Sequence, residues 1–332
     1  MELKNYLLEN EYLKLEVLNI GCAIHRLWVK DASGQFRDVV LGYEHMKDYL
    51  NNSNTYFGVV VGRNANRIAQ AQVEIEGKNY QLEANEGENT LHSGLHGFHE
   101  RIWQVAKQSP TAIIFVLHSP HLDQGFPGNL DMKVTYQLNE NQIIITYEGE
   151  SDATTIFNPT NHAYFNLNGH NSGDIEGHQL QIPAQTITPI MQNTLIPTGE
   201  FMPVIDTPFD LHQGKTVKQA LSQTHEQLTF AGGIDHNFIL DQSATIRLLG
   251  DESGIELSVC TDLPGVQVYT GNFIENESGK EEAVYQKHAG ICLETQFFPD
   301  TPHHAKFPTS LIAAHTPTKH WTSYTFTNQK NS

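Results

Sequence analysis

Short segments in which apolar and polar residues alternate recur along the chain, and Gly, Pro, Asn and Asp separate them. Alternation with a period of two turns the apolar side chains to one face of a strand, so this pattern predicts antiparallel sheets. Residues 134–147 and 244–260 each hold two such segments around a polar turn and are predicted hairpins. Helix signals are confined to residues 44–50 and 217–228, which we expect to form short connecting helices.

The chain contains no internal repeat of fixed period, no low-complexity tract and no Pro/Ser-rich linker. Its 332 residues exceed the length of a typical domain, but all-β domains often run longer than average. Hydrophobic residues make up 39%, which is enough to bury a sizeable core. We therefore predict an all-β fold in which residues 1–332 form one large antiparallel β-sandwich domain with few short helices.

The chain is acidic, with a formal net charge of −18, and its basic residues are scattered. Because no Lys/Arg run is long enough to follow a phosphate backbone or an anionic membrane, we expect no nucleic-acid or membrane partner, and a neutral substrate instead. The widely separated Cys22, Cys260 and Cys292 predict neither a disulfide framework nor a zinc knuckle. Charged residues also interrupt the first twenty positions, and a cytoplasmic location is predicted.

Two of the six arginines, Arg63 and Arg67, lie four residues apart after an apolar segment. A guanidinium group offers several donors in a fixed fork, so Arg67 and its neighbour Asn66 are candidate donors to the hydroxyl groups of a ligand. The alternative is a structural arginine that donates to loop carbonyls. The two interpretations are balanced for Arg67, and the structural one is favoured for Arg63.

Residues 91–99 contain His92, His96 and His99. Their spacing raises the question of a metal site, but glycines interrupt the helix that would align them and no carboxylate lies in the expected place. We therefore predict no metal site. His92 either contacts a substrate or bonds the loop backbone, and His96 and His99 are expected at the surface.

Residues 158–167 carry polar side chains within a strand-like segment. As one strand, this segment would place Thr160, His162, Tyr164 and Asn166 on a single face. A buried histidine is usually bonded to the backbone, but a wall of hydroxyl, imidazole, phenol and amide groups also suits a sugar.

Two carboxyl groups interrupt apolar segments further along the chain. Asp235 follows two glycines, and a turn cap is its simpler interpretation. In residues 290–299, Ile291, Leu293 and Phe297 face one way, which leaves Glu294 on the opposite face. Burial there should raise the pKa of Glu294, as a general base that works near neutrality requires.

Taken together, these segments resemble the aldose 1-epimerase (galactose mutarotase) family, in order and over nearly the whole chain. The resemblance is carried by Gly-Arg-x-Ala-Asn-Arg-Ile (62–68), Leu-His-x-Gly (91–94), Thr-Asn-His-x-Tyr-Phe-Asn-Leu (160–167), Asp-His-Asn-Phe (235–238), Pro-Gly-Val-Gln (264–267) and Leu-Glu-Thr-Gln (293–296). One departure is Ser93, where the family commonly has glycine, and it bears on the shape of that loop.

The resemblance implies a mutarotase-like supersandwich that interconverts the α and β anomers of a free hexose such as galactose or glucose, with no cofactor and no metal. It implies that Glu294 is the general base and His162 the general acid. It further implies that the sugar is held or positioned by five residues: Asn66, Arg67, His92, Asp235 and Gln267.

This chemistry needs only a base for the C1 hydroxyl and an acid for the ring oxygen, and the two must exchange roles in each turnover. We expect burial to raise the pKa of Glu294 and the nearby carboxylate to favour protonated His162, so that the two pKa values converge towards neutrality. The alternatives are a non-catalytic carbohydrate-binding module, a glycosidase or lyase, and a sugar-phosphate epimerase. The preferred hexose, and whether the protein is a monomer or a homodimer, stay open.

Overall fold

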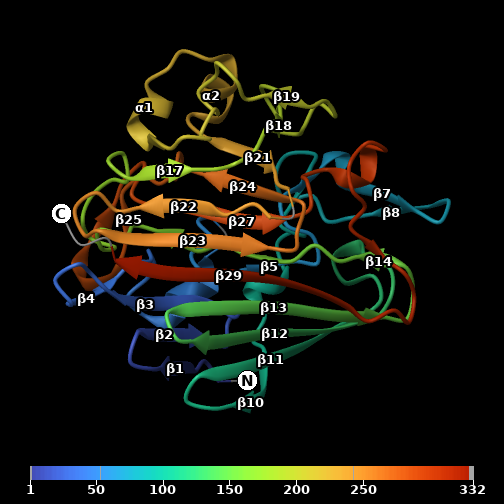
Figure 1. Ribbon diagram of the computed structural model, residues 1–332. Coiled ribbons are helices and arrows are strands. Elements are labelled where there is room, and N and C mark those ends of the chain that lie inside the picture. The colour runs from blue at the N-terminus through green and yellow to red at the C-terminus, as the bar shows by residue number, and fades with distance from the viewer. Residues whose placement is uncertain (1, 53, 242, 329–332) are drawn as a thin grey trace.

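Two antiparallel sheets make up most of the molecule (Figure 1). The computed structural model describes residues 2–52, 54–241 and 243–328. The larger sheet has nine strands, in the order β10 (Gln104–Gln108), β11 (Ala112–Ser119), β12 (Leu130–Asn139), β13 (Gln142–Ser151), β29 (Thr318–Asn328), β23 (Ile255–Thr261), β22 (Ile246–Leu249), β17 (Gln179–Gln181) and β20 (Lys215–Thr216). The second has six strands, in the order β16 (Tyr164–Phe165), β27 (Ile291–Gln296), β24 (Gly265–Tyr269), β21 (Asp235–Ile239), β18 (Thr186–Thr188) and β19 (Met202–Pro203).

Smaller sheets complete the fold. One has four strands: β1 (Asn5–Glu9), β2 (Leu13–Leu18), β3 (Ile24–Lys30) and β4 (Phe36–Asp38). The others are the pairs β5 (Val60–Val61) with β15 (Thr160–Asn161), β6 (Arg67–Ile68) with β9 (Thr90–Leu91), β7 (Gln72–Ile75) with β8 (Lys78–Gln81), β14 (Thr155–Ile156) with β28 (Leu311–Ile312), and β25 (Glu277–Ser278) with β26 (Val284–Tyr285). The large antiparallel β-sandwich predicted from the sequence is confirmed.

Helices are few and short, as predicted. They are α1 (Val217–Leu221), α2 (Glu226–Ala231) and the 3-10 turns η1 (Met46–Asn51), η2 (Ala69–Ala71), η3 (Phe98–Glu100), η4 (Asp123–Gly125), η5 (Lys280–Glu282) and η6 (Thr301–His303). Among the described residues, no helix has both the length and the apolar character needed to cross a membrane.

Both predicted hairpins are present, since β12 pairs with β13 and β22 pairs with β23. The helix predictions need correction. Residues 46–51 form a 3-10 turn, and the single helix expected over 217–228 is two helices. The second helix, α2, has its own N-terminal cap, because the His225 side chain accepts a hydrogen bond from the main-chain N–H of Gln227. This helix ends at Gly232, which has a left-handed conformation.

The main core lies between the two large sheets. Val266 and Leu293 of the six-stranded sheet join one apolar cluster with Ile145, Leu257 and Tyr324 of the nine-stranded sheet. Burial of these side chains is the main favourable contribution to folding. The alternation predicted for residues 290–299 is confirmed within β27, where Ile291 and Leu293 enter this core and Cys292 faces the other way. Phe297 does not continue it, because it lies beyond the end of β27 and outside this cluster.

Residues 158–167 do not form the single strand that was expected. Instead β15 and β16 are separated at His162 and Ala163, because β15 pairs with β5 whereas β16 pairs with β27. The Asn161 side chain accepts a hydrogen bond from the N–H of Ala163 and so stabilises the change of direction. The predicted polar face is therefore divided, and the Asn166 amide instead donates to the carbonyls of Gly173 and Ala289.

Arg63, which lies between β5 and β6, connects several loops. Its guanidinium is buried and donates to Ser119 Oγ and Thr155 Oγ1, and to four main-chain carbonyls: those of Ser119, Pro120, Pro127 and Gly128. The structural interpretation favoured for Arg63 is thus confirmed.

Replacing Arg63 by Lys should destabilise the protein by about 3 kcal/mol, because a single ammonium group cannot reach all of these acceptors and leaves buried carbonyls without partners. The free energy of unfolding from urea titration measures the loss. The matched control is Arg247→Lys, whose exposed ion pair with Glu256 should matter by less than about 1 kcal/mol. Equal stability of the two variants would contradict the anchoring role of Arg63.

Candidate active site

A cavity of about 270 Å³ lies against the face of the six-stranded sheet that is turned away from the core. Six of the seven site residues predicted from the sequence line it: Asn66, Arg67, His92, His162, Asp235 and Glu294. The seventh, Gln267, is buried directly behind this lining. The structure thus brings together residues that are more than 200 positions apart in the sequence.

Strand register explains how these groups meet. Glu294 of β27 is the cross-strand partner of Gln267 in β24, and in the next row Cys292 pairs with Tyr269. The second row continues to Asp235 in β21. Side chains of directly paired residues lie side by side, so the two rows form a continuous polar wall.

Gln267 contacts the carboxylate of Asp235, to which its Nε2 donates at 2.6 Å. Gln267 Oε1 and Glu294 Oε2 are buried and have no hydrogen-bond partner among the described residues. Buried acceptors without partners are costly, and the hydroxyl groups of a ligand are suitable donors for them.

The loops that carry Asn66 and His92 are interlocked. The main-chain N–H of Asn66 donates to His92 Nδ1 at 3.1 Å, and the N–H of His92 donates to the carbonyl of Asn66. Asn66, His92 and Ser93 all have positive φ angles, so the two loops turn sharply. His92 bonds the loop backbone, as one of its two interpretations expected, and its ring also lines the cavity.

Ser93, the departure from the family pattern, is accommodated by its hydroxyl group. Ser93 Oγ accepts from the N–H of Asn64 and donates to the carbonyl of Asn64. The side chain thus connects the two loops and is not among the residues that line the cavity.

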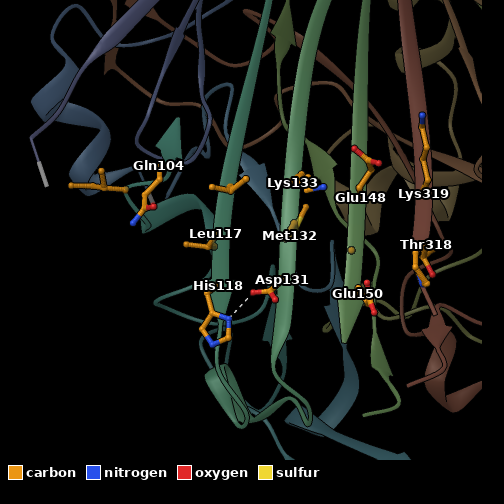
Figure 2. Close-up of a pocket in the computed structure, with 14 residues that line it drawn as sticks. Gln104, Leu117, His118, Asp131, Met132, Lys133, Glu148, Glu150, Thr318 and Lys319 are labelled. Atoms are coloured by element: carbon orange, nitrogen blue, oxygen red, sulfur yellow. Dashed lines mark hydrogen bonds and ion pairs between the residues drawn. The ribbon is translucent and has the colours of Figure 1, made fainter. Parts of the chain in front are cut away.

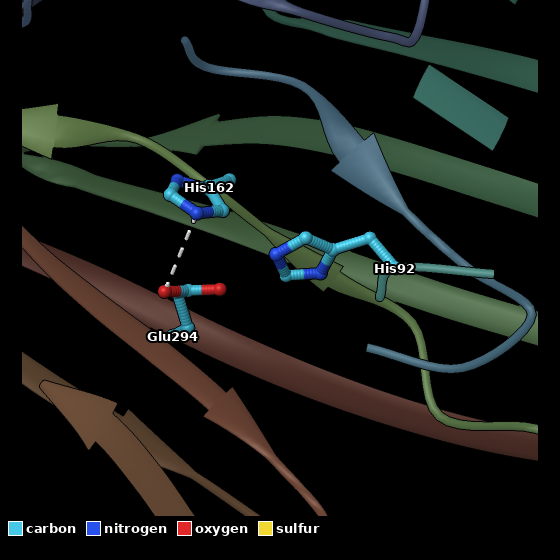
Figure 3. Close-up of side chains that lie close together, drawn as sticks. All are labelled: His92, His162 and Glu294. Atoms are coloured by element: carbon cyan, nitrogen blue, oxygen red, sulfur yellow. Dashed lines mark ion pairs between the residues drawn. The ribbon is translucent and has the colours of Figure 1, made fainter. Parts of the chain in front are cut away.

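Glu294 and His162 lie beside each other at the base of the cavity (Figure 3), with His162 Nε2 at 3.6 Å from Glu294 Oε1. Both are at least 95% buried. Burial raises the pKa of Glu294 well above its ordinary value, and Asp235 adds to this effect. The rise expected for Glu294 is confirmed.

For His162 the expectation was wrong. Burial lowers the pKa of His162 to about 4, because removing the ring from water disfavours its charged form. The two pKa values therefore do not converge. Burial favours the neutral form of both groups, and a single proton shared by the pair is favoured on Glu294.

The tautomers of the two imidazoles follow from their partners. Because His92 Nδ1 accepts a hydrogen bond from Asn66 N–H, the neutral ring carries its hydrogen on Nε2. His162 Nδ1 lies 3.5 Å from Cys292 Sγ, so a hydrogen carried on Nδ1 has this sulfur as its acceptor, and the Nε2 lone pair is then turned towards Glu294.

His92, His162 and Glu294 also have the separations of a possible metal site, since their ligand atoms lie within 4.8 Å of one another. The donor set does not suit a metal, however. A ligating histidine donates its second ring N–H, whereas His92 Nδ1 accepts a hydrogen bond and leaves Nε2 protonated. The three groups are better arranged for proton transfer.

Aromatic side chains complete the cavity, and of these only Tyr164 belongs to the polar face that was expected from the sequence. The ring of Tyr56 lies 4.6 Å from that of His92, and the ring of Tyr164 stacks on His162 at 5.0 Å. Tyr269 and Phe273 continue this surface at the rim. Aromatic residues in strand-like segments usually indicate core packing, so the sequence held no distinct signal for Tyr56, Tyr269 and Phe273.

His99 corrects a second expectation, because it is 1% exposed and does not lie at the surface. The turn η3 directs both Phe98 and His99 inwards, and the ring of His99 packs against Tyr56 at 4.9 Å. Burial lowers the pKa of His99 to about 4, so the ring is neutral at pH 7. His96 is exposed, as expected.

A larger hollow of about 630 Å³ lies elsewhere, on the outer face of the nine-stranded sheet (Figure 2). Its side chains include Lys133, Glu148 and Lys319, which are direct neighbours on adjacent strands, and an exposed pair of His118 with Asp131. None of the predicted site residues lines it. Its charges are mutually matched and open to solvent, so the smaller cavity is the stronger active-site candidate.

The fold and the cavity together define an all-β enzyme with a small, polar candidate active site. The chain belongs to the aldose 1-epimerase family, whose model matches residues 4–325. It is 40% identical to the galactose mutarotase of Sus scrofa, over 97% of this chain and 94% of that protein. The aldose 1-epimerase of Haemophilus influenzae is 38% identical over 82% and 79% of the two chains.

Solved structures agree with this assignment. The crystal structure of an aldose epimerase homologue from C. elegans has a TM-score of 0.92 at 29% sequence identity, and covers 98% of this chain and 99% of that chain. The galactose 1-epimerase of Lactobacillus acidophilus has a TM-score of 0.84 at 25% identity, with 98% of each chain covered.

The tautomer of His92 leads to a prediction about metals. Exhaustive chelation should leave the rate of sugar mutarotation unchanged, because His92 Nε2 carries a hydrogen and cannot ligate an ion while Asn66 N–H occupies Nδ1. Polarimetry before and after dialysis against a chelator measures this. Activity that is lost and then restored only by added Zn²⁺ would overturn the prediction.

Proposed function

We propose that this protein interconverts the α and β anomers of a free aldohexose, with galactose and glucose as its substrates, and that Glu294 and His162 carry the protons. The observation that carries the proposal is the buried pair at 3.6 Å at the base of a sugar-sized polar cavity. Relatives named galactose mutarotase at about 40% identity support the substrate and the reaction.

The reaction needs one proton to leave the C1 hydroxyl and another to reach the ring oxygen. In this proposal the Glu294–His162 pair holds one exchangeable proton, and burial favours its position on the carboxyl group of Glu294. With the proton on His162, Glu294 is the base and His162 the acid. With the proton on Glu294, the roles are exchanged.

These two states are the two halves of one cycle. Ring opening moves one proton from the C1 hydroxyl to Glu294 and one from His162 to the ring oxygen, so the proton of the pair ends on Glu294. Rotation about C1–C2 then turns the aldehyde over. Ring closure reverses both transfers and returns the proton of the pair to His162. A pair that holds one proton in either arrangement is therefore ready for the reaction in both directions. No redox step occurs, and the residues themselves supply every proton transfer.

The other predicted residues have binding roles in this proposal. Arg67 and His92 offer N–H donors to sugar hydroxyls, and Asp235, held by Gln267, is a charged acceptor. The tyrosine rings of the cavity provide flat apolar surface for the sugar ring. Retention of both proton carriers favours an enzyme over a carbohydrate-binding module of the same fold.

We also propose a cytoplasmic location. The three cysteines are all free, and two of them are buried, which agrees with a reducing compartment.

Glu294→Gln and His162→Gln should each lower kcat by about 10² or more, because each removes one proton carrier. Glu294→Gln keeps the shape of the side chain, and His162→Gln keeps some hydrogen-bonding capacity. Polarimetric rates with galactose measure kcat, and calorimetry should show that the sugar still binds. His96→Gln, at an exposed histidine, is the matched control and should be unaffected. A near-normal kcat for His162→Gln would transfer the acid role to His92.

The pH dependence of kcat/KM reports the pKa values of the free enzyme. Burial lowers the pKa of His162 to about 4. Below this pH His162 also becomes protonated, the pair then holds two protons and has no base, and the rate should fall. The alkaline fall should come where the raised pKa of Glu294 is passed and the pair loses its last proton. An acid limb near the ordinary histidine value, after subtraction of the uncatalysed rate, would contradict the neutral resting state.

A further inference from the structure

Arg67 does not stand alone in the cavity. Its Nε and Nη2 both donate at 2.7 Å to the two carboxylate oxygens of Glu86. This two-point contact fixes the plane of the guanidinium group. Its Nη1 makes no hydrogen bond with the described residues, so this nitrogen is the donor left for a ligand.

Glu86 lies in the loop before β9, at the rim of the cavity. Its main chain is fixed by two hydrogen bonds with Asn89, and β9 pairs Leu91 with Arg67. The Arg67 side chain is nearly buried, whereas the carboxylate of Glu86 is about one-third exposed. Glu86 therefore covers one side of Arg67 and itself lines the cavity.

The charges of the cavity are unequal. Arg67 is the single cationic lysine or arginine among the described lining residues, and it faces three carboxyl groups: Glu86, Asp235 and Glu294. Glu86 engages this cation directly. The imidazoles of His92 and His162 are neutral at pH 7, because burial lowers the pKa of each ring.

We infer that Glu86 is a positioning residue that fixes the Arg67 guanidinium and cancels its charge, so that the cavity accepts uncharged aldoses and rejects sugars that carry a carboxylate or a phosphate. This inference rests on the proposed function and names the property of the site that restricts its substrates. In a cavity of about 270 Å³, any anionic group of the ligand lies within the range of these charges. An anion would meet carboxylates without a free cation to pair with.

The test compares galactose with D-galacturonate, which has the same ring configuration and a carboxylate at C6. Glu86→Gln removes the negative charge and leaves the Arg67 cation unpaired. We expect kcat/KM for galactose to fall about threefold, because Arg67 loses its fixed position, and kcat/KM for galacturonate to rise about threefold. The ratio of the two values then shifts about tenfold towards the anionic sugar.

Opposite changes for two substrates cannot arise from a loss of folded protein, which lowers both values together and leaves their ratio unchanged. Glu88→Gln is the matched control, because Glu88 lies in the same loop and contributes the same charge at an exposed position without contacting Arg67. Glu86→Asp keeps the charge and should retain the wild-type preference for galactose.

An unchanged ratio in Glu86→Gln, or an equal shift in Glu88→Gln, would overturn the inference while the proposed function stands. Wild-type protein that does not accelerate the mutarotation of galactose would overturn the proposed function, and this inference with it.

Discussion

The packing of the six-stranded sheet onto the nine-stranded sheet is the constraint on which the rest of the molecule depends. Val266, Val268 and Leu293 must enter the core between the sheets, and the period of two then turns their neighbours to the opposite face. A shift of one residue in β27 would exchange Leu293 and Glu294. The same apolar burial that stabilises the sandwich therefore places the polar wall of the cavity.

Burial also decides the protonation of that wall. In water a carboxyl group beside an imidazole becomes an ion pair, but here removal from water favours the neutral form of each partner. Arg67 is the fixed charge that opposes this effect, since it lowers the pKa values of Asp235 and Glu294. The ion pair with Glu86 fixes the position of Arg67, and therefore affects both the binding of the substrate and the pKa of Glu294.

Local sequence patterns predicted the hairpins, the strand around Glu294 and the structural role of Arg63. The predictions that failed concern features that depend on residues distant in the sequence. The break at His162 arises because β15 and β16 pair with different strands, and the neutral state of His162 arises from burial by residues that are remote in the chain. Glu86 had no local signal, since an acidic residue in a polar loop is ordinary until its contact with Arg67 is known.

The polar wall joins Tyr164, Asp235, Gln267 and Glu294 only through pairings between separate strands. Such non-local contacts form late in folding, after the entropy of closing long loops has been overcome. Residues 66–92 and 162–294 both contribute to the site, so no short fragment of the chain contains it. Catalysis is therefore an all-or-none indicator of a completed fold, and recovery of activity during refolding should follow the final closure of the six-stranded sheet.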